Sequence, residues 1–253
     1  MRPDGTGVRT LVVGRRLEAS TPVWSPDGRR IAFVRSDINE LGIYVVGRDG
    51  GGLRRLATGS EPSWSPDGSR IAFGAGAGPT SAIFTVRLDG SDRRQLTRPR
   101  LVYDGTPDWS PDGRRIAFVR DNDRVALIHV MKADGSNRFR LAGGIQPRWS
   151  PDSRRLAFVP GDAGGISVMD ADGSRQRQLP TVPRYLRRFE TYDGYPTWSP
   201  DGSRLAFVRF VSEPGLKPDP SGIYVVGTDG SNRRSLLTGR TVSGLDWWAP
   251  PVR

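Results

Sequence analysis

The sequence predicts an all-β fold, a six-bladed β-propeller built from four-stranded antiparallel blades. The first observation is a repeated word, Trp-Ser-Pro-Asp, which begins at Trp24, Trp64, Trp109, Trp149 and Trp198. The second is that each copy is followed by Ile-Ala-Phe or Leu-Ala-Phe, and the third is a later Asp-Gly pair in every copy. The copies lie 40 to 49 residues apart, and self-similarity at this period is typical of propeller blades.

The first repeat divides into four short strands. Residues 21–24 form the first expected strand, and the Ser-Pro-Asp-Gly that follows fits a type I turn closed by a glycine that tolerates positive φ. The apolar runs 31–34 and 43–46 are expected to be buried second and third strands. Asp49-Gly50 is a hairpin signal, and residues 53–56 alternate apolar and basic side chains, as an exposed outer strand does.

We expect a single domain over residues 1–253. Its repeats are expected at about 20–58, 60–98, 105–142, 145–180 and 194–238. Residues 4–13 match the outermost strand of a repeat, and residues 245–250 match the innermost one, with Trp248-Ala249-Pro250 as a degenerate copy of the word. These segments are expected to form an incomplete sixth blade. Either that blade is reduced, or the chain is part of a longer protein.

The repeated residues also predict how the blades pack. An alanine between two large apolar residues in each second strand indicates close packing where neighbouring blades meet. The tryptophans are expected to fill the space between blades, and the turn aspartates to accept hydrogen bonds from the backbone. Ser153 replaces the turn glycine of the fourth repeat, which at positive φ is expected to cost about 1–2 kcal/mol.

Composition narrows the possible functions. The chain has no cysteine, which excludes disulfides, thiol nucleophiles and thiolate metal sites. Its formal net charge is +11, and because arginines recur at the turns of every repeat, we expect them to form a solvated rim. No apolar stretch approaches the roughly 18 residues of a membrane span, and residues 1–5 carry no apolar signal-peptide region.

The repeat word resembles that of the TolB-type propeller family. The matching residues read Pro-x-Trp-Ser-Pro-Asp-Gly, Ile-Ala-Phe, Ile-Tyr, Asp-Gly and Arg-x-Leu, over nearly the whole chain. The resemblance implies a ring of six or seven blades, usually periplasmic or otherwise outside the cytoplasm, that binds other proteins. The residues themselves predict that the protein is not an enzyme. Similar repeats also build the propellers of prolyl-oligopeptidase relatives, so the resemblance does not select one member of the group.

A partner site is expected on the face that carries the variable loops, near the mouth of the central channel. Tyrosine and arginine are enriched at interaction hot spots. The candidates are Arg184, Tyr185, Arg187, Arg188, Tyr192, Asp193, Tyr103 and Asp104. Tyr-Asp-Gly occurs twice, at 103–105 and 192–194. The alternative is that each copy is a turn leading into a strand, with its tyrosine packed on the adjacent blade.

Other functions are less well supported by the residues. A serine-peptidase relative would need a Gly-x-Ser-x-Gly elbow, which is missing, and nucleic-acid binding would rest on charge alone. His129 stands where other repeats carry Tyr or Phe, which favours packing over catalysis. Residues 121–123, Asp-Asn-Asp, lack the glycine and distal glutamate of a calcium loop. We therefore expect a monomeric binding protein with no cofactor and no metal.

Overall fold

The computed structural model describes residues 18–36, 41–77, 80–161, 165–181, 191–211, 221–239 and 244–247. Within these ranges every regular element is a β-strand. The expected closing strand at 4–13 lies outside the described residues, as does Trp248-Ala249-Pro250.

Five groups of four strands follow one another along the chain. The first contains β1 (Glu18–Trp24), β2 (Arg30–Ser36), β3 (Leu41–Gly47) and β4 (Arg54–Thr58). The second contains β5 (Ser60–Trp64), β6 (Arg70–Ala77), β7 (Thr80–Arg87) and β8 (Arg94–Gln95). The third contains β9 (Tyr103–Trp109), β10 (Arg115–Asp121), β11 (Ala126–Lys132) and β12 (Phe139–Gly143). The fourth contains β13 (Ile145–Trp149), β14 (Arg155–Val159), β15 (Ser167–Asp170) and β16 (Arg177–Gln178). The fifth contains β17 (Thr191–Trp198), β18 (Arg204–Val211), β19 (Gly222–Gly227) and β20 (Arg234–Thr238).

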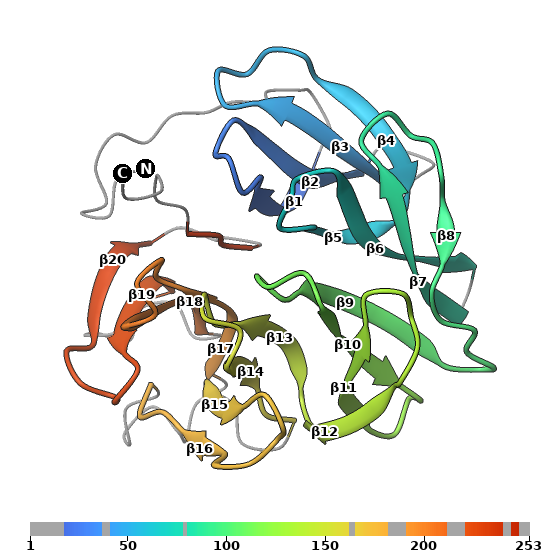
Figure 1. Ribbon diagram of the computed structural model, residues 1–253. Helices are drawn as coiled ribbons and strands as arrows, with labels where there is room; N and C mark the ends of the chain where they lie inside the picture. Colours follow the sequence, from blue (N-terminus) through green and yellow to red (C-terminus); the bar gives the residue numbers. More distant parts are fainter. Residues whose placement is uncertain are drawn as a thin grey trace.

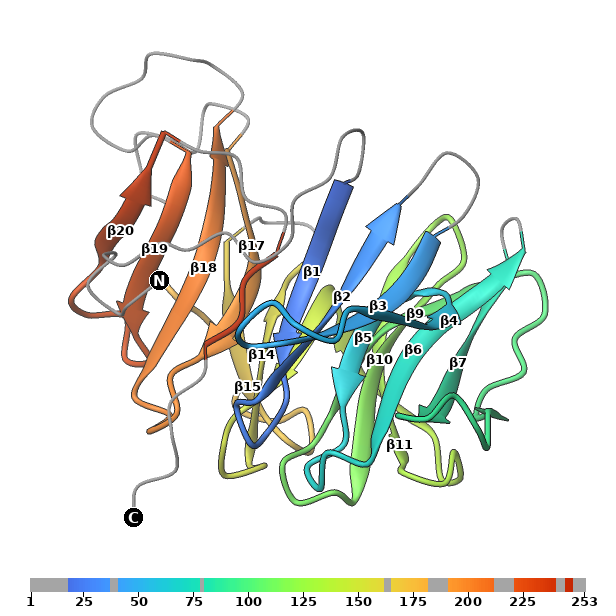
Figure 2. The ribbon, with the colours of Figure 1, turned by 90° about the horizontal axis from the view of Figure 1, so that it is seen from above.

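The groups are arranged radially around a common centre, as the repeat period predicts (Figure 1). Each group is antiparallel in chain order, and its first strand lies innermost. A short parallel bridge between Ser81 and Tyr103 joins the second and third groups into one sheet. Seen from above, the strands of neighbouring groups run along similar directions (Figure 2). Residues 244–247 lie near the centre, between the fifth and first groups.

The third and fifth groups begin earlier than expected. Tyr103 pairs with Asp121, and Tyr192 pairs with Phe210, so each Tyr-Asp-Gly belongs to an innermost strand instead of a loop before it. The sequence could not show this because aspartate and glycine are rare in strands. Here the aspartate is held in place by an arginine on the neighbouring strand.

A bulge interrupts all five innermost strands at the same place. The residue before the conserved proline has positive φ in each, at Thr21, Glu61, Thr106, Gln146 and Tyr195. The pairing with the second strand shifts register across each of these positions. A proline has no N–H to offer the ladder, so a bulge lets the strand continue past it.

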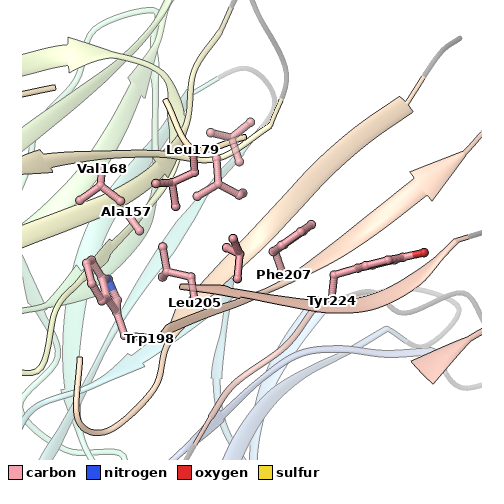
Figure 3. Close-up of a cluster of buried hydrophobic side chains, with 10 residues drawn as sticks. Ala157, Val168, Leu179, Trp198, Leu205, Phe207 and Tyr224 are labelled. Carbon is pink, nitrogen blue, oxygen red and sulfur yellow. The ribbon is translucent and has the colours of Figure 1, made fainter. Parts of the chain in front are cut away.

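The hydrophobic core lies between neighbouring groups, which confirms the packing predicted from the repeats. Figure 3 shows one such cluster, in which Ala157 and Val168 of the fourth group face Trp198, Leu205 and Phe207 of the fifth. Ala32, Ala72 and Ala117 belong to the equivalent clusters, and each is fully buried. A side chain larger than alanine at these positions would force the sheets apart.

The Ser-Pro-Asp-Gly turns also form as predicted. Ser25 donates its hydroxyl to Asp27, whose Oδ1 accepts the main-chain N–H of Arg29 at 3.0 Å, and the other four turns repeat this pattern. Ser153 takes the expected positive φ of 59°. Its hydroxyl accepts the N–H of Asp112 from the preceding group at 3.0 Å, a bond that glycine cannot make. This hydrogen bond offsets the strain that the sequence predicted.

Candidate functional site

The two Tyr-Asp-Gly aspartates are structural. The Asp104 carboxylate is fully buried and accepts two hydrogen bonds from Arg120, at 2.7 and 2.8 Å. Asp193 is likewise buried and accepts two from Arg209, at 2.8 and 2.9 Å. The expectation that these carboxylates contact a partner is therefore wrong, because solvent does not reach them. Asp193 neutralises the fully buried guanidinium of Arg209, and Asp104 pairs with Arg120, whose side chain is 31% exposed.

The remaining predicted contact residues stay predictions. Tyr103 is half-buried and donates its hydroxyl to Glu61 of the neighbouring group at 2.9 Å. Tyr192 stacks against Phe210 with ring centres 5.9 Å apart, and burial raises the pKa of its hydroxyl to about 12. Tyr103 thus contacts the neighbouring group, as the alternative interpretation expected, whereas the ring partner of Tyr192 lies in its own group. Arg184, Tyr185, Arg187 and Arg188 lie outside the described residues.

A cavity opens on the opposite face, at the Ser-Pro-Asp-Gly turns. It has a volume of about 480 Å³ and lies on the central axis. We call it the funnel. Its wall consists of tryptophans and turn prolines from around the ring, namely Trp24, Trp64, Trp109, Trp149, Trp198, Trp247, Pro26, Pro66, Pro111, Pro151 and Pro200. Trp247 therefore occupies the sixth tryptophan position, one residue before the position expected from the degenerate copy Trp248-Ala249-Pro250.

The floor of the funnel is formed by the residue that precedes each tryptophan. Around the ring these residues are Val23, Ser63, Asp108, Arg148, Thr197 and Asp246. Three of them accept the main-chain N–H of the next tryptophan in the ring, Ser63 from Trp109 at 2.9 Å, Asp108 from Trp149 at 2.6 Å and Asp246 from Trp24 at 2.7 Å. The last of these hydrogen bonds links residues 222 apart in sequence. The floor residues therefore differ from group to group. Three of them also link neighbouring groups through hydrogen bonds.

Two of the floor residues, Asp108 and Asp246, carry carboxylates. Burial raises the pKa of Asp108 to about 6, despite the nearby Arg148 guanidinium and the Trp149 N–H, and the charge of Asp246 raises it further. Burial also raises the pKa of Asp246, against the hydrogen bond from Trp24. Arg148 donates to Asp108 across 3.1 Å. With both carboxylates ionised, the floor carries two negative charges and one positive charge.

Arginines contact the tryptophans of the funnel wall. The guanidinium of Arg115 lies 4.5 Å from the centre of the Trp149 ring, and that of Arg155 lies 4.8 Å from the Trp198 ring. Arg115 also donates to the main-chain carbonyl of Ser153 at 3.0 Å. The sequence predicted that these arginines form a solvated rim. In the structure Arg115 and Arg155 instead link the third group to the fourth and the fourth to the fifth, through cation–π contacts and hydrogen bonds.

The other end of the axis is narrow among the described residues. A cavity of about 80 Å³ is lined by the five bulge residues and by Arg148. Glu61 accepts the N–H of Thr106 at 2.6 Å, and Gln146 accepts that of Tyr195 at 2.7 Å. Burial raises the pKa of Glu61. Hydrogen bonds between neighbouring groups therefore also surround this end of the axis, and its cavity leaves little room for a ligand.

The minor candidates from the sequence have local partners. His129 stacks on Phe118 with ring centres 5.5 Å apart, just as Tyr44 stacks on Phe33, which confirms its predicted packing role. Asp121 and Asn122 accept main-chain N–H groups of their own turn. Over the described parts of the chain, no group of three His, Cys, Asp or Glu side chains is placed to hold a metal ion. Those same parts contain no helix that could span a membrane.

The chain belongs to the TolB beta propeller domain family. The family matches residues 4–182 and 57–250, which together extend over nearly the whole sequence. This agrees with the repeat word and with the radial arrangement of four-stranded antiparallel groups. No curated protein matches the chain.

Solved structures with the same fold include proteins of several kinds. TolB from Acinetobacter baumannii is 21% identical with a TM-score of 0.75, over 91% of this chain and 57% of that protein. A protein from Agrobacterium tumefaciens assigned to TolB is 24% identical with a TM-score of 0.69, over 87% of this chain and 80% of that one. An oligogalacturonate lyase in complex with manganese is 17% identical with a TM-score of 0.62, over 90% and 68%. At these identities the likeness shows the fold alone.

The floor of the funnel was not predicted from the sequence. Its signal was present in the repeat, since the residue before each tryptophan varies, whereas its neighbours in the five intact copies are always proline and tryptophan. In the six copies that position holds valine, serine, aspartate, arginine, threonine and aspartate. A variable position inside an otherwise constant word, repeated around a ring, places different side chains at one level of the axis.

Proposed function

We propose that this protein is a non-catalytic propeller that binds a segment of a protein partner in the funnel. The observation that carries the proposal is the funnel itself, a cavity of about 480 Å³ with tryptophan and proline walls. Binding pockets are typically concave and apolar, with a few polar groups that set specificity. Trp64, Trp149 and Trp198 are each less than a tenth exposed, so the wall is already rigid before a ligand arrives.

The family supports a protein partner, and we extend the family's usual location, outside the cytoplasm, to this chain. We expect the protein to act as a monomer. The proposal includes a ring with a sixth position, to which residues 244–247 contribute the innermost segment. The hydrogen bond from Trp24 to Asp246 and the placement of Trp247 in the funnel wall support this sixth position.

Site-specific photo-crosslinking tests the proposal. A photoreactive residue replaces Pro151, an exposed proline on the funnel rim, and in a matched control it replaces Leu53, which is 41% exposed at the outer edge. After irradiation in cells, the proposal expects one specific protein adduct from position 151 and none from position 53. Adducts of equal yield from both positions, or none from position 151, would reject the funnel as the partner site.

The loop-bearing face remains the alternative location. The same experiment with the photoreactive residue at Tyr192 or Tyr103 tests it, since both are only partly buried. A specific adduct from these positions, together with none from position 151, would favour the face that the sequence predicted.

A further inference from the structure

The floor of the funnel carries one positive charge against two negative charges when both carboxylates are ionised. Asp108 has a cation beside it, Arg148, at 3.1 Å. Among the described residues, the hydrogen bonds to Asp246 come from neutral donors, namely the N–H of Trp24 at 2.7 Å, the hydroxyl of Thr197 at 3.3 Å and the N–H of Trp247, while Arg148 acts on Asp246 through its charge alone. A carboxylate offers about four acceptor sites, so Asp246 retains capacity for a further donor. One more positive charge would neutralise the floor.

The tryptophan wall of the funnel can also contact a positively charged group. Trp24, Trp109 and Trp247 are only half-buried, so part of each indole remains accessible. The protein already pairs guanidinium groups with indoles of this ring, at 4.5 Å for Arg115 on Trp149 and 4.8 Å for Arg155 on Trp198. A cation entering the funnel meets indole rings of the same kind from the inner side, and carboxylates below them. Aromatic walls above acidic groups are a known way to recognise cations.

One indole N–H of the funnel wall, that of Trp149, has no hydrogen-bond acceptor among the described residues. Trp64 and Trp198 donate their indole N–H to main-chain carbonyls of the preceding group, at 3.1 and 2.9 Å. Trp149 is 5% exposed and lines the funnel, yet its indole N–H has no acceptor among the described residues. A buried N–H without an acceptor costs about 1–3 kcal/mol.

We propose that the funnel recognises a single arginine or lysine side chain of the protein partner, held between Asp246, Asp108 and the tryptophan wall. This inference rests on the proposed function and specifies its ligand. An acidic side chain would meet two carboxylates, and an apolar one would cover them without neutralising them, which is unfavourable in a buried site. The raised pKa of Asp108 supports the inference, because a bound cation would stabilise the ionised carboxylate.

Binding should therefore be weaker in acid. The charged groups that face Asp108 are Arg148 from the fourth group and Asp246 from the closing segment. As the pH falls below about 6, Asp108 takes up a proton and the floor loses its net negative charge.

Three capped pentapeptides test the inference. Each has glycine at four positions and differs only at the centre, which is arginine, citrulline or glutamate. Citrulline has the shape of arginine without its charge. Binding is followed at pH 7.5 through the indole N–H signals of the tryptophans in the ¹⁵N-labelled protein. The arginine peptide is expected to shift the funnel indoles, with affinity at least about tenfold higher than the citrulline peptide. The glutamate peptide is expected to shift none of them.

A variant and its control locate the contact. Asp246→Asn keeps an oxygen that can accept the Trp24 N–H but removes the charge, and it is expected to weaken the arginine peptide about tenfold. Asp112→Asn changes an exposed turn aspartate and is expected to leave binding unchanged. The comparison of arginine with citrulline uses the unaltered protein, so it does not depend on how the variant folds.

The outcomes separate the two proposals. Equal binding of arginine and citrulline, or no indole shift with the arginine peptide, overturns the cationic ligand. A specific adduct from position 151 would then leave the partner site standing. Indole shifts with the arginine peptide but no adduct would instead support the cation site and reject a protein partner.

Discussion

Replacing Trp198 by alanine removes a side chain that joins the fourth and fifth groups. Trp198 is 5% exposed and packs against Ala157 and Val168 (Figure 3). Its indole N–H donates to the carbonyl of Arg148 at 2.9 Å, and Arg155 covers its ring at 4.8 Å. Burial of about 200 Å² at about 25 cal/mol per Å² contributes roughly 5 kcal/mol, and the hydrogen bond adds about 1 kcal/mol. Because the alanine methyl and local relaxation recover part of this, we expect a loss of about 4–5 kcal/mol.

Urea unfolding followed by far-ultraviolet circular dichroism measures the loss. Trp109 provides the matched control, because it occupies the same place in the repeat but is only half-buried, and Trp109→Ala is expected to cost about 2–3 kcal/mol. A cost below about 2 kcal/mol for Trp198→Ala, or equal costs for the two variants, would refute the reasoning that these tryptophans stabilise the fold by filling the space between sheets.

Three further predictions follow from the polar groups. Asp193→Ala is expected to cost about 3–5 kcal/mol, because it leaves the fully buried Arg209 without its carboxylate; urea unfolding checks this, and a loss under about 1 kcal/mol would contradict the structural role given to the pair. Ser153→Gly is expected to change stability by less than about 1 kcal/mol, since relief of positive φ offsets the lost bond to Asp112; a shift in melting temperature of more than a few degrees would be inconsistent with that balance. For Asp108 the folded pKa of about 6 lies above the ordinary aspartate value of 3.8, so the folded state binds the extra proton and stability falls by up to about 3 kcal/mol as pH rises from 4 to 6. Asp108→Asn is expected to reduce this slope and leave the part that Asp246 and Glu61 contribute through their own raised pKa values, and an unchanged slope in unfolding measured across that pH range would show that other groups cause it.

The aspartates of the turns titrate in the opposite sense. Hydrogen bonds from the Ser199 hydroxyl and the Ser203 N–H lower the pKa of Asp201 to about 2. A lowered pKa stabilises the fold above the unfolded value, and this contribution is lost as pH falls through the folded one. The two classes of aspartate therefore affect stability in separate pH ranges, which allows the slope between pH 4 and 6 to be assigned to the axis and not to the turns.

Most of the fold could be predicted because the repeat supplies local and global signals together. The Ser-Pro-Asp-Gly word specifies a turn by its own backbone preferences, and its period places the turns on one face. The alanines could be assigned to the space between sheets because a small residue between two large ones has that meaning in a packed layer. These inferences needed only neighbours in sequence.

The site could not be predicted in the same way. Asp104 and Asp193 looked like surface residues because their partners, Arg120 and Arg209, lie 16 residues away on the next strand. The pairing register that brings them together depends on where the bulge falls, and the sequence does not state this. Trp247 was misaligned by one residue because no intact Ser-Pro-Asp follows it to set the register.

The funnel was missed for a related reason. Its floor combines one residue from each of six places in the chain, and only the ring brings Asp108 and Asp246 together. Loop length indicated a site on the loop-bearing face. Variation at the residue before each tryptophan indicated the face of the Ser-Pro-Asp-Gly turns instead.

The most direct test of the funnel as a cation-selective site uses a chain that has no cysteine of its own. Ser63→Cys places one thiol on the funnel floor, and Ser69→Cys places one on an exposed turn as the control. The labelling rates of a cationic and an anionic methanethiosulfonate reagent of similar size are compared at both positions. We predict that the ratio of cationic to anionic rate is at least about tenfold higher at position 63 than at position 69. Equal ratios at the two positions, or faster labelling of position 63 by the anion, would contradict the account.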